Sequence, residues 1–183
     1  MNTEIIHHGV ITLSGKVVVS DPCYDRGAWC MKTDFPVKPG RYYAFAVYSD
    51  EGKMGIRVAA LALYHEDYIR MPLFDWQRID CTIGVDSGQC GIFDDSAYPQ
   101  TKDHPDHEPF YDECCKITLA DSQAGILRSK QGVVSTSGYG DGTYALKTIA
   151  REGENVALML DFDLVNMGAM VRKLTAAERG IEQ

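Results

Sequence analysis

The chain has 183 residues, of which 45% are hydrophobic and 24% are charged, values that are ordinary for one globular domain. Its formal net charge is −8 and it has no stripe of Lys and Arg, which argues against binding to a nucleic acid. No apolar run is long enough to cross a membrane, and the first residues lack the features of a signal peptide. We therefore expect a single cytoplasmic domain over residues 1–183 that contacts neither nucleic acid nor membrane.

The first third of the chain is typical of β structure. Residues 9–13 and 16–20 are rich in β-branched side chains and are separated by Ser14-Gly15, which predicts a tight hairpin. Residues 42–49 and 56–64 are two more apolar runs around an Asp-Glu-Gly turn, which predicts a second hairpin.

The middle of the chain predicts short strands at 79–85 and 91–93 around a glycine-rich loop. Residues 98–109 are polar and hold three prolines, as expected for a surface loop. One short helix is predicted near 109–120, because Pro109 favours a helix start and apolar residues then recur on one face. The last segment, 175–183, is polar and predicts a short helix or a frayed tail.

Two parts of the chain show the same order of features. Residues 9–64 and 125–164 each read as strand, special loop, Gly-x-Tyr strand, Glu-Gly turn and strand, with residues 65–124 as an insert. This order predicts an internal duplication with Asp21 and Asp141 at equivalent strand exits, and chance similarity between β sequences is the alternative. The predicted fold class is mainly β, either a two-layer antiparallel sandwich or a flattened barrel.

Three segments concentrate glycines, carboxylates and hydroxyls directly beside strands, as in a binding site built from loops on a rigid scaffold. They surround Asp21, Asp86 and Asp141. The candidate ligand-binding residues in these segments are Asp21, Cys23, Tyr24, Asp86, Ser87, Gln89, Asp94, Ser137, Tyr139, Asp141 and Tyr144.

The same segments carry three ordered motifs, SDPCY at 20–24 with Trp29-Cys30 beyond it, VDSGQ-x-GIFD at 85–94 and SGYGDG at 137–142. Together they resemble an uncharacterised family of bacterial and phage proteins that is known as a domain of unknown function. The match covers about residues 15–162. The resemblance implies a shared site but no established activity. Cys90 stands where the family has small residues, so the resemblance gives this thiol no catalytic role.

Several chemistries are compatible with these residues. A divalent cation is one, with oxygen ligands from Asp86, Asp94, Asp95 and the Gln89 carbonyl. The alternative is that Asp86 and Asp94 accept backbone N–H bonds and shape turns, which we favour for at least one of them. We predict no cofactor.

A nucleophile is a second option, since Cys23 and Ser137 both lie in candidate loops. Activation needs a positioned base, and no nucleophile-elbow pattern is present, so we expect Cys23 to be a packed loop anchor. A pair of acids among Asp21, Asp86 and Asp141 is the third option and would suit a hydrolase.

No complete catalytic constellation follows from the sequence. The first functional hypothesis is therefore a binding module for a small polar ligand or a protein partner. A hydrolase that uses Asp carboxylates, with or without a metal, is the alternative. A third hypothesis is an interaction protein of phage or host defence, which rests on the resemblance alone.

Overall fold

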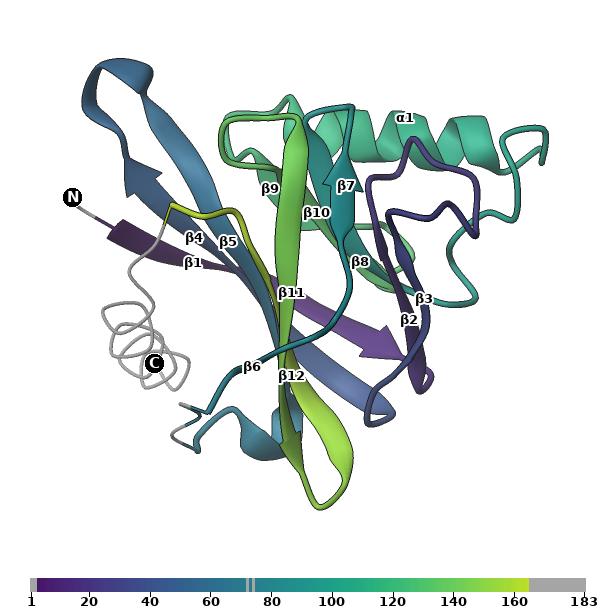
Figure 1. The fold of residues 1–183 in the computed structure, drawn as a ribbon, viewed down its shortest axis with the longest axis vertical. Coiled ribbons are helices and arrows are strands. Elements are labelled where there is room, and N and C mark those ends of the chain that lie inside the picture. Colours follow the sequence, from purple (N-terminus) through teal and green to yellow (C-terminus); the bar gives the residue numbers. More distant parts are fainter. Residues whose placement is uncertain (1–2, 72, 74, 165–183) are drawn as a thin grey trace.

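The computed structural model describes residues 3–71, 73 and 75–164. Two antiparallel sheets pack face to face and do not close into a barrel (Figure 1). The fold is therefore the mainly β sandwich predicted from the sequence, and the flattened barrel is not formed. Among the described residues there is one α-helix, α1 (His107–Thr118), and it lies against the smaller sheet.

The larger sheet has the strand order β1-β4-β5-β12-β11-β6, and β7 pairs with the start of β11. Its strands are β1 (Thr3–Leu13), β4 (Gly40–Asp50), β5 (Ile56–His65), β6 (Gln77–Arg78), β7 (Ile83–Val85), β11 (Gly142–Arg151) and β12 (Glu154–Asp161). The smaller sheet has the order β3-β2-β8-β10-β9. Its strands are β2 (Lys16–Ser20), β3 (Lys32–Pro36), β8 (Gln89–Asp94), β9 (Ala124–Ile126) and β10 (Gly132–Thr136). Two short 3-10 helices are η1 (Gly52–Met54) and η2 (Glu66–Tyr68).

The central strands of the smaller sheet are apolar at nearly every position because both of their faces are covered. Successive side chains of a strand point to opposite faces. Val17 and Val19 of β2 therefore join the core between the sheets, while Val18 joins a second core beneath α1. In β8, Ile92 and Phe93 divide between the two cores in the same way.

The outer face of the larger sheet is covered by the segment that follows β5. Tyr68, Ile69 and Leu73 of this segment pack on Phe45 and Tyr64 of the sheet. β4, β5 and β12 are thus buried on both faces as well, which explains their long apolar runs.

The predicted hairpin of residues 9–20 is wrong. β1 pairs with β4 in the larger sheet, whereas β2 pairs with β3 and β8 in the smaller one. Ser14 donates its N–H and hydroxyl to the carboxylate of Asp94, and Gly15 turns the chain with a φ of +123°. The Ser14-Gly15 step is therefore a corner between the two sheets and not a hairpin turn.

The second predicted hairpin is confirmed as β4 and β5, and the predicted helix is confirmed as α1. The helix begins two residues before Pro109, which still lies in the first turn, where a missing N–H breaks no helical bond. Phe110, Cys114 and Ile117 face the sheet as their spacing predicts. The predicted terminal segment 175–183 lies outside the described residues.

Both predicted repeat units contribute strands to both sheets. The larger sheet is symmetric in order about its central β5–β12 pair, which β4 and β11 flank. In the smaller sheet β2 and β10 flank β8 in the same manner. A duplication would produce this arrangement, but strand order does not test common ancestry, so the duplication stays a prediction.

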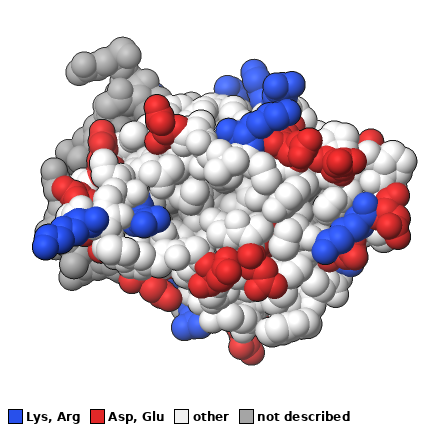
Figure 2. All heavy atoms as spheres, turned by 90° about the horizontal axis from the view of Figure 1, so that it is seen from above, with Lys and Arg blue, Asp and Glu red and all other residues white. Residues whose placement is uncertain are grey.

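Among the described residues, no helix combines the length and apolar character that crossing a membrane requires. Figure 2 looks down from above the view of Figure 1, onto the end of the molecule where several strand-connecting loops lie. On this face, Lys and Arg side chains and Asp and Glu side chains form small separate groups, with uncharged surface between them.

The corner at Ser14 makes stability depend on the ionised form of Asp94. Burial alone would raise the pKa of Asp94, but hydrogen bonds from Ser96 and Ser14 lower it overall. A pKa that is lower in the folded state contributes stability in full above about pH 4, and this contribution is lost as the pH falls through the folded pKa.

We expect Asp94→Asn to lower the free energy of unfolding at pH 7 by about 1–3 kcal/mol, because an amide cannot accept all of these bonds. As the pH falls below about 4, the wild type should lose more stability than the variant. Urea unfolding at several pH values measures both effects. Asp121→Asn, at an exposed aspartate, is the control. Equal pH dependence of Asp94→Asn and wild type would contradict the assignment.

Candidate functional site

A buried carboxylate joins the first two candidate loops. Asp21, directly after β2, is fully buried. Its Oδ1 accepts bonds from the Cys23 N–H at 2.9 Å and from the Ser87 hydroxyl at 2.6 Å. Its Oδ2 accepts from the backbone N–H groups of Asp86 at 2.9 Å and Ser87 at 2.7 Å. Each carboxylate oxygen has two acceptor positions, so all four are occupied by the chain itself.

The third candidate loop lies against the second. The Ser137 N–H donates to the Gly88 carbonyl at 3.1 Å, and Gly142 at the start of β11 pairs with Val85 at the end of β7. The structure therefore brings together the loops around Asp21, Asp86 and Asp141, which chain position alone did not establish.

The three loops surround a cavity of about 220 Å³. The cavity is lined by Tyr24, Ala28, Trp29, Cys30, Gly84, Val85, Asp86, Gly142 and Thr143. Of the predicted site residues, Tyr24 and Asp86 line it directly.

Two predicted residues and one thiol meet inside this cavity. Burial, followed by hydrogen bonding to Asp86 and Cys30, raises the pKa of the Tyr24 hydroxyl well above its usual range. The phenol therefore stays protonated at neutral pH. The side chain of Trp29 is 85% exposed at the rim. The cavity thus combines an accessible carboxylate, a hydroxyl and an uncovered aromatic ring.

The loop that carries Tyr24 and Trp29 is fixed from behind. The buried Tyr98 hydroxyl donates to the Tyr24 carbonyl at 2.7 Å. Arg26 forms an ion pair with Asp95 at 2.8 Å, which ties the same loop to the end of β8. These contacts hold the cavity wall in place, and they also engage Asp95, one of the proposed cation ligands.

The third loop satisfies most of its own polar groups. Buried Ser137 donates its hydroxyl to the Gly140 carbonyl at 2.9 Å, and the Tyr144 hydroxyl contacts the same carbonyl at 2.7 Å. Tyr139 is exposed and donates to Glu51 at 2.9 Å. These three side chains shape the loop and lie outside the cavity lining.

The predicted equivalence of Asp21 and Asp141 is wrong. Asp21 is the first residue after β2. The first residue after β10, which ends at Thr136, is Ser137, and Asp141 lies directly before β11. Asp21 is buried with every acceptor position engaged, while Asp141 is exposed. The two carboxylates therefore have different environments, and nothing in their contacts joins them as an acid pair.

Three other candidates lie away from the cavity. Gln89 is buried and accepts from Thr118 of α1 at 3.2 Å. Asp94 lies at the opposite end of β8, where it holds the Ser14 corner, so the preference for a turn-shaping role is supported for this residue. Burial, and then the charge of Asp21, raises the pKa of Cys23 to about 12, so its thiol is protonated at neutral pH.

No group of three or more His, Cys, Asp or Glu side chains within the described part of the chain is arranged to hold a metal ion. The six cysteines are all free thiols.

Sequence reasoning missed several cavity residues. Trp29, Cys30 and Thr143 line the cavity but were not among the candidate site residues, although Thr143 lies in the third glycine-and-aspartate segment. A tryptophan within a loop of polar residues and glycine was the one local signal for Trp29. Thr143 is brought in by the pairing of β7 with β11, for which no local signal exists.

Comparison with family models, with curated proteins and with solved structures found no match.

Asp21→Asn tests the central role of this carboxylate. An amide has one acceptor oxygen and places an NH₂ group against N–H donors. We therefore expect the backbone N–H groups of residues 86 and 87 to lose their hydrogen bonds to this side chain. Hydrogen exchange at the amides of Asp86 and Ser87 should accelerate by at least about tenfold, and stability should fall by about 2–4 kcal/mol. Asp141→Asn is the matched control, because Asp141 is exposed. Unchanged exchange at both amides would contradict the role.

Proposed function

We propose that the protein is a binding module whose three-loop cavity holds a small polar ligand. The observation that carries this proposal is the contrast between two neighbouring carboxylates. All acceptor positions of Asp21 are engaged by the chain itself, three of them by Asp86 and Ser87 of the second loop, whereas the Asp86 side chain is exposed at the cavity.

The lining suggests the chemistry of the ligand. An accessible carboxylate next to a phenol favours a ligand with hydrogen-bond donors, such as an ammonium, guanidinium or sugar hydroxyl group. The exposed ring of Trp29 suits a flat or cationic part of the same molecule. The cavity volume of about 220 Å³ is below the usual range for drug-sized ligands, which favours a metabolite of few atoms.

A hydrolase that uses Asp21, Asp86 and Asp141 is the weaker alternative. General acid or base catalysis requires a carboxylate that reaches substrate, and the acceptor positions of Asp21 are all engaged by the chain. Asp86 is thus the one of these candidates that lines the cavity. The resemblance to a bacterial and phage family, and the defence-related role it suggests, stay predictions.

A thermal-shift screen tests the proposal directly. The panel comprises free amino acids, polyamines, monosaccharides and nucleosides, each with the purified full chain. A ligand at about a hundredfold its Kd stabilises the native state by about 2.7 kcal/mol, which raises the Tm by roughly 5 °C or more.

Two variants locate the site. Asp86→Asn keeps the backbone N–H that bonds Asp21 but removes the charge, and Trp29→Ala removes an exposed ring. Each should weaken the Kd for the best ligand by about tenfold or more, with little change in the Tm of the free protein. Asp121→Asn controls for net charge. Binding that survives both cavity variants, or a panel without any stabilising ligand, would count against the proposal.

A further inference from the structure

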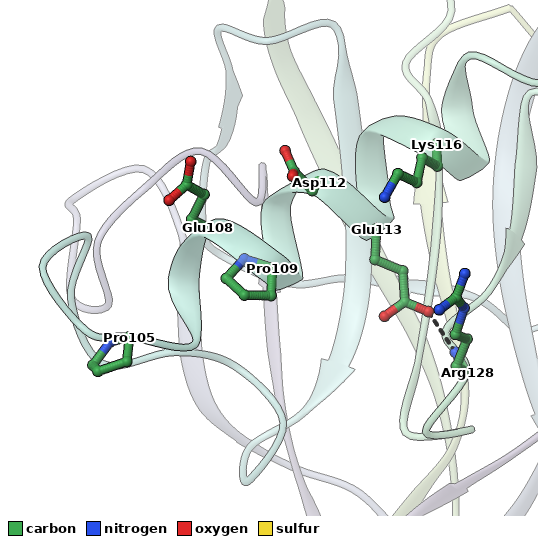
Figure 3. Close-up of a pocket in the computed structure, with 7 residues that line it drawn as sticks. All are labelled: Pro105, Glu108, Pro109, Asp112, Glu113, Lys116 and Arg128. Atoms are coloured by element: carbon green, nitrogen blue, oxygen red, sulfur yellow. Dashed lines mark hydrogen bonds between the residues drawn. The ribbon is translucent and has the colours of Figure 1, made fainter.

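A second concave surface lies beside α1 and shares no lining residue with the three-loop cavity. Two adjoining hollows of about 500 and 350 Å³ run along the exposed side of α1. They share Glu113, Lys116 and Arg128, so they form one continuous depression, which we call the α1 groove. Figure 3 shows the residues that line the first hollow.

One wall of the α1 groove is an open sheet edge. β9 is the last strand of the smaller sheet, and within the described part of the chain it pairs only with β10. The Leu127 N–H donates to Gly132 and the Gln123 carbonyl accepts from Thr136, both at 2.9 Å. In an antiparallel ladder these bonds alternate, so Gly125 faces β10. The N–H and C=O groups of Ala124 and Ile126 therefore point outward.

These outward groups are presented to the groove. Ala124 and Ile126 both line it, yet their side chains pack into the core between the sheets, so their main chain faces the groove. A Cβ on Gly125 would lie 3.0 Å from Ile117 of α1, so the glycine lets helix and strand approach closely. An unpaired strand edge is a template for an added strand.

The other wall carries charges at a regular spacing. Glu108, Asp112 and Lys116 follow one another at four-residue intervals on the exposed side of α1 (Figure 3). Among the described residues none of these three forms an ion pair. Glu113 is engaged, because its carboxylate accepts the Arg128 N–H at 2.7 Å. Near β9 the groove holds Lys116, Arg128 and the carboxylate of Glu113, which leaves one net positive charge, whereas Glu108 and Asp112 make it negative toward Pro105.

We propose that the α1 groove docks an extended segment of a partner protein, which pairs with β9 and matches the charges of α1. Four helical residues advance about 6 Å and two strand residues advance about 6.8 Å, so alternate side chains of the segment meet successive charges. The segment carries an acidic residue opposite Lys116 and basic residues opposite Asp112 and Glu108.

The direction of the segment follows from the packing. Ile117 lies at Gly125 and Glu113 at Arg128, so β9 and α1 run in opposite directions. All strand pairs between the described residues are antiparallel, and a segment added to β9 in the same way runs along α1. Its order is thus basic, any residue, basic, any residue, acidic, and then a β-prone stretch.

Two synthetic peptides test the proposal by fluorescence anisotropy with the full chain. One has the sequence Lys-Thr-Lys-Thr-Glu-Val-Thr-Val-Thr, and the other has its Lys and Glu residues exchanged. Three exposed charge contacts favour the first peptide, so we expect it to bind about tenfold more tightly than the second. Asp112→Lys, at an exposed position, should reduce or reverse this preference.

A pair of variants isolates the main-chain contact. Ile126→Ala and Ile126→Pro both remove the partly buried side chain, but only proline also removes the outward N–H. We expect the alanine variant to bind the first peptide and the proline variant to lose binding by about tenfold or more. If the proline variant does not fold, hydrogen exchange of the wild type tests the main-chain contact instead. Bound peptide should slow exchange at Ala124 and Ile126, with Gly125 as the internal reference.

The proposal is overturned if the two peptides bind equally or not at all, or if Asp112→Lys leaves the ratio of their affinities unchanged. Protection at another sheet edge, instead of at Ala124 and Ile126, would also overturn it. So would self-association of the free protein through β9, measured by light scattering, because a second copy would then be the occupant. None of these readouts depends on a ligand in the three-loop cavity.

Discussion

The loop end of this molecule depends on one buried carboxylate. Asp21 has no contact with solvent, and a carboxylate in such a place is tolerated only when donors surround it. Three of its four donors come from Asp86 and Ser87, so β7 is fixed relative to β2. β7 in turn pairs with the start of β11, which brings in the third loop. The cavity between Tyr24 and Asp86 is therefore a consequence of an interaction that lies behind its wall.

Local sequence patterns correctly predicted the elements whose buried faces are visible as a regular spacing of apolar residues. The β4–β5 hairpin and α1 carry periodic apolar residues and clear turn or proline signals, and both form as expected. The pairing of β1 was not predictable in this way. Two adjacent β-prone runs with a Ser-Gly step look like a hairpin, and only the distant Asp94 turns the step into a corner. Assignment of strands to sheets is decided by such contacts across the chain and not by propensity.

The candidate site was predictable as a set of segments but not in the roles of its residues. Glycine and carboxylate density correctly indicated loops of special geometry, and these loops meet. A high local content of glycine and carboxylate does not distinguish a carboxylate that accepts bonds from nearby backbone N–H groups from one that faces outward. Asp21 and Asp94 are of the first kind and Asp86 is of the second, although all three looked alike in the sequence. Trp29 lines the cavity because its loop is anchored by the Arg26–Asp95 ion pair and the Tyr98–Tyr24 hydrogen bond. Both contacts join residues that are far apart in the sequence.

The shortness of β9 has a consequence for how the protein behaves in a crowded solution. A long open edge pairs with any exposed strand, including strands of unfolded chains, and so promotes aggregation. β9 spans three residues and turns only Ala124 and Ile126 outward, so another strand gains few backbone bonds from it. Any segment that stays there must add side-chain contacts with α1. The short edge that limits indiscriminate strand pairing would also make the proposed docking brief and reversible, which suits a partner that is exchanged often.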